Sequence, residues 1–301
     1  MKYLYYPGCS LRSTGRAYEE SMLSVFRALE IELEELPDWN CCGATAYASI
    51  DEKKAFGLAA RNLALAEQHR NGSAQTSPDL LAPCSACFLV LMKSQHYYQE
   101  YQEVKDEVND GLNAAGLQYH GTTKVRHPLD MLVNDYGLDK IAKRVRKPLK
   151  GLRVASYYGC QIVRPFSTFD DPFYPTSMDR LVKALGGEPV DWPLKTRCCG
   201  GSLTGTIKEA GIRVTRCLLK EGERKKADMM ITCCPLCQFN LECYQDEINS
   251  SFGDSLNMPI LYFTQLMGLA LDLPEKELGI QRLFVKPKKT KAPEGGALVH
   301  A

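Results

Sequence analysis

The chain has 301 residues, with 37 Lys and Arg against 36 Asp and Glu. This balance excludes a general nucleic-acid binder, which would carry a basic stripe, and an acidic disordered chain. The apolar content of 45% fits a packed globular protein, and the length allows two domains of ordinary size. The longest apolar stretch, residues 258–273, contains Pro259 and Asp272 and falls short of the roughly 20 residues that cross a bilayer. We therefore expect no membrane span and, without a signal peptide, a cytoplasmic protein.

The sequence pattern of residues 1–150 predicts four strands that alternate with helices. Apolar side chains at Tyr18, Met22, Phe26 and Leu29 recur every three to four residues, which indicates an amphipathic helix after the first strand. The strands are expected at 2–6, 31–37, 80–83 and 123–127. Further helices are expected over 51–71, where Gly72 is the stop signal, near 86–108 and from 128 onward.

Residues 151–285 predict the same order again, and residues 286–301 are predicted to be a flexible tail. Strands are expected at 152–158, 188–192, 228–233 and 259–263. Helices are expected near 175–185, 202–223 and 235–248, with one more at the end. Strands that alternate with helices form parallel sheets with right-handed crossovers. The predicted fold is therefore α/β, with two pseudo-symmetric, Rossmann-like repeats, 1–150 and 151–285.

The two halves also carry their cysteines in the same order, a single cysteine, an adjacent pair followed by glycine, and a C-x-x-C. The intervals are 31 and 41 residues in the first half and 37 and 34 in the second. Such internal similarity indicates a duplicated structural unit. The first set is Cys9, Cys41, Cys42, Cys84 and Cys87, and the second is Cys160, Cys198, Cys199, Cys234 and Cys237.

Each of these cysteine groups follows a predicted strand, so each set should gather at the carboxyl edge of its sheet. A structural zinc ion takes four ligands, which leaves one cysteine over in each half. Dithiol exchange at a C-x-x-C needs only two thiols. An iron–sulfur cluster in each half accounts for more of the cysteines. We expect the glycine after each pair, Gly43 and Gly200, to let a bulky cofactor approach the backbone.

The double motif resembles the CCG domains in the B subunit of heterodisulfide reductase, over about residues 1–275. The resemblance implies two noncubane 4Fe–4S clusters, each held by one complete set of five cysteines. It also implies that the clusters face one another and cleave the mixed disulfide of coenzyme M and coenzyme B between them. The expected partners are a small ferredoxin-like C subunit and a flavin-bearing A subunit. Catalysis is assigned to the clusters, so no catalytic side chain is expected.

Two other interpretations remain open at this point. The substrate could be a different disulfide, because related CCG domains occur in other oxidoreductase complexes. The chain could also be a non-catalytic iron–sulfur subunit that relays electrons within a larger anaerobic complex.

Four side chains close to the cysteines are weaker candidates. Arg12 and Arg164 follow Cys9 and Cys160, and a guanidinium suits the sulfonate and phosphate of the implied substrate, although solvated helix-start charges are an alternative. Trp39 and Trp192 precede the two cysteine pairs. We predict that they shield the clusters from water.

The remaining candidates have a structural interpretation. Cys233 is predicted to pack at a strand end, and Cys217 and Cys243 are predicted to be buried thiols inside helices. His127 and its approximate counterpart Tyr262 follow the last strand of each half. Either could hydrogen-bond near a cluster, but a packed and satisfied side chain is the preferred expectation.

Overall fold

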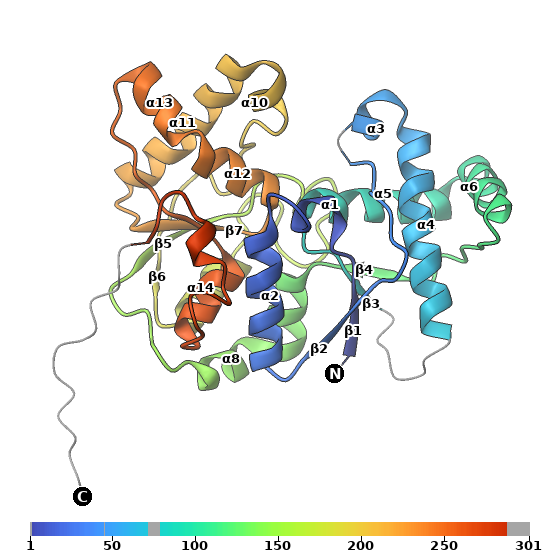
Figure 1. Cartoon of the computed structure of the whole chain (residues 1–301), viewed down its shortest axis with the longest axis horizontal. Helices are drawn as coiled ribbons and strands as arrows, with labels where there is room; N and C mark the ends of the chain where they lie inside the picture. The colour runs from blue at the N-terminus through green and yellow to red at the C-terminus, as the bar shows by residue number, and fades with distance from the viewer. Residues whose placement is uncertain (1, 45, 72–78, 288–301) are drawn as a thin grey trace, which may run out of the picture.

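Two four-stranded parallel sheets with the same strand order form the centre of the molecule (Figure 1). The structure is a computed structural model that describes residues 2–44, 46–71 and 79–287. The first sheet has the order β2-β1-β3-β4 and the second β6-β5-β7-β8. The strands are β1 (Lys2–Tyr5), β2 (Glu32–Glu35), β3 (Asp79–Leu81), β4 (Lys124–Arg126), β5 (Arg153–Tyr157), β6 (Glu188–Pro189), β7 (Met229–Thr232) and β8 (Ile260–Tyr262). The predicted α/β class with two repeats is confirmed.

Helices connect the strands in both halves, and several are shorter than predicted. Those of the first half are α1 (Gly8–Leu11), α2 (Arg16–Ala28), α3 (Ala46–Ile50), α4 (Glu52–Asn71), α5 (Ser85–Glu100), α6 (Gln102–Ala114), α7 (Pro128–Asp130), a π-helical segment η1 (Met131–Gly137) and α8 (Leu138–Arg144). Those of the second half are α9 (Ser177–Ala184), α10 (Leu203–Thr206), α11 (Lys208–Arg224), α12 (Pro235–Cys243), α13 (Gln245–Phe252), α14 (Phe263–Ala270) and a short 3-10 helix η2 (Ile280–Arg282).

Three predicted helices are each divided in two, and a single non-helical residue makes each break. Tyr101 separates α5 from α6 with extended dihedrals of φ −123° and ψ 114°. Ile207, with φ −118° and ψ 72°, separates α10 from α11, and Tyr244 separates α12 from α13. Apolar periodicity alone could not reveal these breaks, because none of the three residues is glycine or proline. Gly72 and residues 288–301 of the predicted tail lie outside the described residues.

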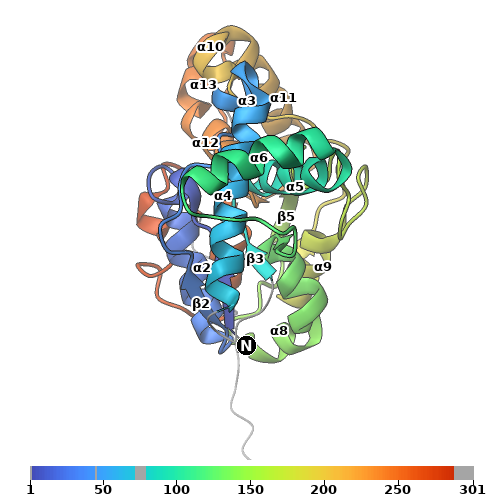
Figure 2. The same cartoon turned by 90° about the vertical axis from the view of Figure 1, so that its right-hand side faces the viewer.

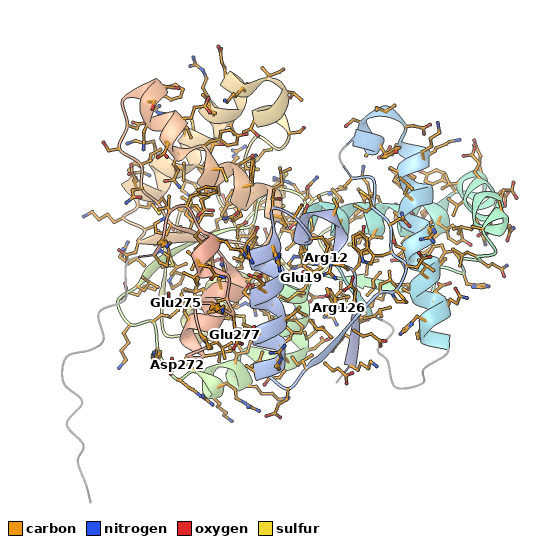
Figure 3. The ribbon with its side chains drawn as sticks, viewed as in Figure 1. Arg12, Glu19, Arg126, Asp272, Glu275 and Glu277 are labelled. Atoms are coloured by element: carbon orange, nitrogen blue, oxygen red, sulfur yellow. The ribbon has the colours of Figure 1, made fainter. Side chains whose placement is uncertain are left out.

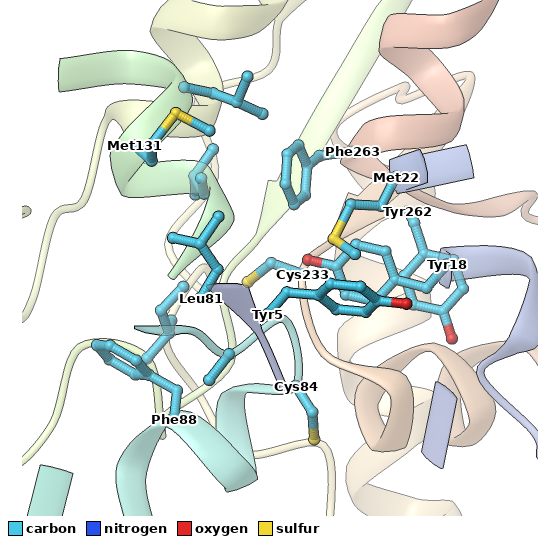
Figure 4. Packing of buried hydrophobic residues seen from close by; sticks show 14 of the residues in the cluster. Tyr5, Tyr18, Met22, Leu81, Cys84, Phe88, Met131, Cys233, Tyr262 and Phe263 are labelled. Atoms are coloured by element: carbon cyan, nitrogen blue, oxygen red, sulfur yellow. The ribbon is translucent and has the colours of Figure 1, made fainter. Parts of the chain in front are cut away.

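The two halves pack against each other through two corresponding pairs of helices. Helix α2 of the first half lies along α14 of the second (Figure 1), and α8 of the first half contacts α9 of the second (Figure 2). The rings of Tyr18 and Tyr262 stack with centroids 4.5 Å apart, and the hydroxyls of Ser21 and Thr264 are 2.7 Å apart. Figure 4 shows this packing around Cys84 and Cys233. One apolar core therefore crosses the boundary between the repeats.

The outer helices α4, α5 and α6 form a layer on the first half (Figure 2). Within the described part of the chain, no helix combines the length and the apolar character needed to cross a membrane.

A buried arginine at the end of β4 fastens the first sheet to the segment that follows it. Arg126 donates from Nε to Asp130 Oδ2 at 2.7 Å and from Nη1 to Asp79 Oδ2 at 3.0 Å. Its guanidinium also pairs with both carboxylate oxygens of Asp135. The side chain is seen in Figure 3, and its residue is 7% exposed.

Replacing this guanidinium should destabilise the fold, since three carboxylates would lose their shared cation. We expect Arg126→Leu to lower the free energy of unfolding by about 3 kcal/mol in urea denaturation. The control is Arg144→Leu, because Arg144 forms an exposed ion pair with Glu30 that should contribute little. Equal stability of the two variants would contradict the role assigned to Arg126.

Candidate metal centres

The first cysteine set gathers at the carboxyl ends of β1, β2 and β3. Cys9 lies in α1, directly after β1, and the Cys41-Cys42 pair lies in the loop after β2. Cys84 is the N-cap residue of α5, and Cys87 lies in its first turn. The sulfur atoms of Cys42 and Cys87 are 3.2 Å apart, although 44 residues separate them in the chain.

The second set occupies the equivalent places in the second half. Cys160 follows β5, the Cys198-Cys199 pair follows β6, and Cys234 is the N-cap residue of α12 with Cys237 in its first turn. The predicted convergence at the carboxyl ends is confirmed in both halves. It follows from the parallel order of the strands, because every crossover returns to the same edge.

Short-range interactions between thiols connect the first set, apart from Cys9, to the second, and the one between Cys42 and Cys87 spans 3.2 Å between the sulfur atoms. In the first half they link Cys41 to Cys42, Cys42 to Cys87, and Cys87 to Cys84. In the second half they link Cys234 to Cys237, Cys237 to Cys199, Cys199 to Cys198, and Cys198 to Cys160. Cys84 and Cys234, the equivalent residues of the two C-x-x-C motifs, interact across the boundary between the halves, where their chain neighbours Ser85 and Cys233 are in contact. The two sets are therefore direct neighbours.

The clustered thiols favour the thiolate form at selected positions. The pKa of Cys42 is lowered because Cys41 and Cys87 hydrogen-bond to its sulfur. The pKa of Cys198 is lowered for the same reason by Cys160 and Cys199. The pKa of Cys234, which is fully buried, is lowered by Cys237 and Cys84. The thiolate is the form that binds metals, and each set contains at least one thiol whose lowered pKa favours that form.

A cavity of about 190 Å³ opens beside the second set. All five cysteines of that set line it, together with Ala44, Ser49 and Ser85 from the first half. Among the residues that the structure describes, no three His, Cys, Asp or Glu side chains surround a point as the ligands of a single metal ion would. Each set instead supplies five thiols, one more than a tetrahedral metal ion takes, and sulfur donors in that number fit a group with several irons.

Two glycines that the sequence analysis did not single out bring the backbone close to the thiols. Gly8 and Gly159 precede Cys9 and Cys160 and have φ values of +65° and +70°. A Cβ added to Gly8 would lie 3.0 Å from Cys87 Sγ, and one added to Gly159 would lie 3.0 Å from Cys237 Sγ. The Gly-Cys dipeptide in both halves was the signal that could have identified them.

The glycines after the cysteine pairs lie against helices. A Cβ on Gly43 would meet Ala55 of α4 at 3.3 Å, and one on Gly200 would meet Gly211 of α11 at 3.4 Å. Both have positive φ, +77° and +99°. These glycines therefore allow a turn and close helix packing, while the amide of Gly43 also lies 3.5 Å from Cys41 Sγ, and the approach of a cofactor to them stays a prediction.

A buried tyrosine in each half holds the loop that carries the cysteine pair. Tyr6 donates to the carbonyl oxygen of Asn40, and Tyr157 donates to that of Arg197, both at 2.7 Å. Both acceptors directly precede the cysteine pairs. The alignment of "YYPGC" with "SYYGC" places these tyrosines at equivalent positions, which was the signal for them in the sequence.

The two tryptophans pack on these tyrosines. Trp39 meets the ring of Tyr6 edge-on with centroids 5.6 Å apart, and Trp192 lies 6.0 Å from the ring of Tyr157. Trp192 is buried, whereas Trp39 is partly exposed and donates from Nε1 to Glu35. Both rings thus lie on the loops that hold the thiols, where a shielding role stays a prediction.

The three cysteines outside the sets differ in burial. Cys233 is fully buried, and its sulfur lies 3.8 Å from the hydroxyl of Ser85 in the other half. Cys243 is only partly buried, and Cys217 is exposed, so the prediction that both are buried is wrong. The apolar face of α11 contains Ile212, Leu218 and Leu219. Cys217 lies on the solvent side of the helix.

His127 is a packed and satisfied side chain, as expected. It is fully buried, Nε2 lies 2.8 Å from the Pro83 carbonyl oxygen, and Nδ1 accepts from the amide of Leu129 at 3.1 Å. Burial lowers its pKa to about 4, so the ring is neutral at pH 7 and Nε2 carries the proton. The histidine thereby anchors the residue before Cys84. Tyr262 is buried as well, with its hydroxyl 3.5 Å from Gln238 Oε1.

The two candidate anion-binding arginines have different surroundings. The guanidinium of Arg12 pairs with Glu19, at 3.2 Å, and with Glu35 (Figure 3 labels Arg12 and Glu19). Arg164 donates to the Thr196 carbonyl oxygen, and its charge lowers the pKa of Cys198. Only Arg164 therefore leaves its positive charge beside a cysteine set.

Comparison with known proteins supports the duplicated motif. The CCG family, described as a cysteine-rich domain, matches residues 3–92 and 154–242. The chain belongs to the CCG cysteine-rich domain family. The two matched segments carry all ten cysteines of the two sets.

Relatives of this CCG protein come from reductase complexes. It is 31% identical to the 8-methylmenaquinol:fumarate reductase membrane anchor subunit of Wolinella succinogenes, over 96% of this chain and 98% of that one. It is 31% identical to an Archaeoglobus profundus protein named as similar to the B subunit of heterodisulfide reductase, over 93% and 94% of the two chains. It is 28% identical to the B subunit of the ferredoxin:CoB-CoM heterodisulfide reductase of Methanosarcina mazei, over 93% and 92%.

These relatives confirm the resemblance to the B subunit of heterodisulfide reductase and support an iron–sulfur subunit of a reductase complex. A crystal structure of a hypothetical protein from Helicobacter pylori has the same fold, with a TM-score of 0.77 at 17% identity. The match covers 95% of this chain but only about half, 52%, of the other.

Adding a methyl group next to the thiols of the second cysteine set should weaken metal binding by that set. We expect Gly159→Ala to lower the iron and acid-labile sulfide bound per chain, because its Cβ would press on Cys237 Sγ. Gly151→Ala is the matched control, since Gly151 has a similar φ of +72° but no atom within 4 Å of the added Cβ. Equal iron loss in both variants would assign the effect to backbone strain alone.

Proposed function

We propose that the chain is the catalytic subunit of a heterodisulfide reductase-type complex, which reduces a disulfide to two thiols. The disulfide is of the coenzyme M–coenzyme B type. Each cysteine set would hold one noncubane 4Fe–4S cluster, with Cys9, Cys41, Cys42, Cys84 and Cys87 as one set of ligands and Cys160, Cys198, Cys199, Cys234 and Cys237 as the other. When bound, the two clusters would supply the two electrons that reduction of one disulfide requires.

The proximity of Cys84 and Cys234, whose chain neighbours Ser85 and Cys233 are in contact, is the observation that carries this proposal. It makes the two cysteine sets direct neighbours across the pseudo-symmetric boundary. The two sulfur atoms of a disulfide are directly bonded, so sites that act on both must also be adjacent. A pair of distant clusters would serve electron transfer equally well and would not need this arrangement.

Residues of both halves have defined tasks in this proposal. Tyr6 and Tyr157 hold the loops of the cysteine pairs, and His127 holds the segment before Cys84. Arg164 would bind an acidic group of the substrate near the second set. Arg12 is the weaker candidate, because two carboxylates already occupy its guanidinium.

The proposed partners are a ferredoxin-like C subunit and a flavin-bearing A subunit, which would deliver the electrons in the cytoplasm. The 31% identity to the fumarate reductase subunit of Wolinella supports a second candidate function. There the chain would be an iron–sulfur subunit that relays electrons within a quinol-linked reductase and does not itself reduce a substrate.

One anaerobic experiment separates these functions. The purified protein is assayed for iron and acid-labile sulfide and then for viologen-driven reduction of disulfides, including the coenzyme M–coenzyme B heterodisulfide. About eight irons per chain with turnover are expected. Eight irons without turnover on any disulfide would favour the relay, and zinc without sulfide would contradict both.

Loss of the tryptophan beside the first set should make its cluster more sensitive to oxygen. Trp39→Ala removes the ring that packs on Tyr6, which opens the loop of Cys41 and Cys42 to solvent. We expect the iron–sulfur absorbance of this variant to bleach faster in air. Tyr101→Ala, which removes an exposed ring between α5 and α6, is the control and should bleach at the wild-type rate. Identical bleaching of all three proteins would contradict the shielding role.

A further inference from the structure

The two cysteine sets are equivalent in chain order, but their hydrogen-bond donors differ at one position. Asn240 lies in α12, six residues after Cys234. Its Nδ2 lies 3.4 Å from Cys199 Sγ, 3.3 Å from the Cys199 carbonyl oxygen and 2.8 Å from the Gly201 carbonyl oxygen. The side chain is fully buried. An amide donor therefore reaches a proposed ligand sulfur of the second set.

The surroundings of Asn240 determine which end of its amide faces the sulfur. The hydroxyl of Thr204 donates to Oδ1 at 3.0 Å. On the other side, the amide meets two carbonyl oxygens and a thiol sulfur. A flipped amide would point Oδ1 at those acceptors and leave both carbonyls without this donor. The NH₂ group must therefore point toward Cys199.

The first half has no side-chain amide at the equivalent position. Six residues after Cys84 stands Val90, which is buried on α5 and cannot donate a hydrogen bond. The loop of the first pair is held instead by Asn62, which bonds to the backbone of Asn40 at 2.9 and 3.1 Å. Asn62 therefore holds the loop of the first pair, as Asn240 holds that of the second. Its hydrogen bonds join it to backbone atoms and not to a thiol.

The other donors to the adjacent pairs occur in both halves. The backbone amide two residues later reaches the second cysteine of each pair, from Ala44 to Cys42 and from Gly201 to Cys199. The Tyr6 hydroxyl also interacts with Cys42, but its short hydrogen bond goes to the Asn40 carbonyl oxygen at 2.7 Å, the counterpart of that from Tyr157 to Arg197. The Asn240 amide therefore remains as the difference.

The positive charge near the two sets also differs, and it again favours the second set. Arg164 lies within electrostatic reach of Cys198 and forms no ion pair with an acidic residue in the described segments. Its counterpart Arg12 is neutralised by Glu19 and Glu35. A donor and a positive charge next to a ligand both stabilise the more negative, reduced state of an iron–sulfur cluster.

We propose that Asn240, through its hydrogen bond to Cys199 Sγ, raises the reduction potential of the second cluster above that of the first. The two clusters would then be unequal electron acceptors, and the second would be reduced before the first. This inference rests on the proposed function, since it requires both clusters. It makes Asn240 a positioning residue that tunes a ligand, and no proton transfer is involved.

The test is an anaerobic redox titration of the iron-loaded protein, followed by electron paramagnetic resonance. The wild type should show two one-electron steps at separate potentials. Asn240→Leu should lower the higher potential and leave the lower one in place. We expect at least a tenfold change in the one-electron equilibrium, which corresponds to about 59 mV. Asn240→Asp, which loses the donor and adds negative charge, should shift the same step in the same direction.

Thr204→Val separates the donor from a purely structural role. This variant removes the partner of Oδ1 but keeps the Nδ2 donor on Cys199. It should leave both potentials unchanged, even if the protein melts earlier. An equal shift in Thr204→Val and Asn240→Leu would overturn the inference, as would coincident potentials in the wild type.

Iron analysis keeps this test distinct from that of the proposed function. Two loaded clusters with an unchanged potential in Asn240→Leu would overturn this inference alone. A protein that binds no iron and sulfide would overturn both.

Discussion

The contact between Cys84 and Cys234 is the constraint on which the rest of the site depends. Each cysteine caps the helix that follows the third strand of its half, so the contact places the carboxyl edges of both sheets against each other. The distance between the two sets depends on the positions of the strands that precede them, because a displaced strand would separate the thiols. The pairing of α2 with α14 and of α8 with α9 joins the two halves that carry these thiols.

Pseudo-symmetry explains why many supporting residues occur twice. Gly8 and Gly159 open the space beside the C-x-x-C sulfurs, and Tyr6 and Tyr157 hold the loops of the adjacent pairs. Each duplicate acts through the same backbone geometry, which a parallel strand followed by a helix reproduces in both halves. These features belong to the domain as such, and they are needed whichever reductase the chain serves.

The departures from symmetry are the features that can make the two sites behave differently. Asn240 faces a sulfur where Val90 has only methyl groups, and Arg164 keeps the charge that Arg12 shares with two carboxylates. The cavity likewise adjoins the second set and draws part of its wall from the first half. A reaction that takes two electrons in turn would benefit from such inequality, whereas two identical sites would compete for the first electron.

The amino-acid sequence by itself determined the class of fold and the membership of the two cysteine sets. Strand and helix periodicities differ, and a parallel βα repeat has only one edge at which residues after its strands can meet. The sequence could not reveal the helix breaks at Tyr101, Ile207 and Tyr244, because their causes lie in packing and not in local residue preference. For the same reason, the exposure of Cys217 was misjudged, and the packing of Gly43 and Gly200 against helices was not foreseen. Only the tertiary structure decided that Cys84 meets Cys234 and that Asn240 reaches Cys199, since both contacts join segments whose distance in space no local pattern encodes.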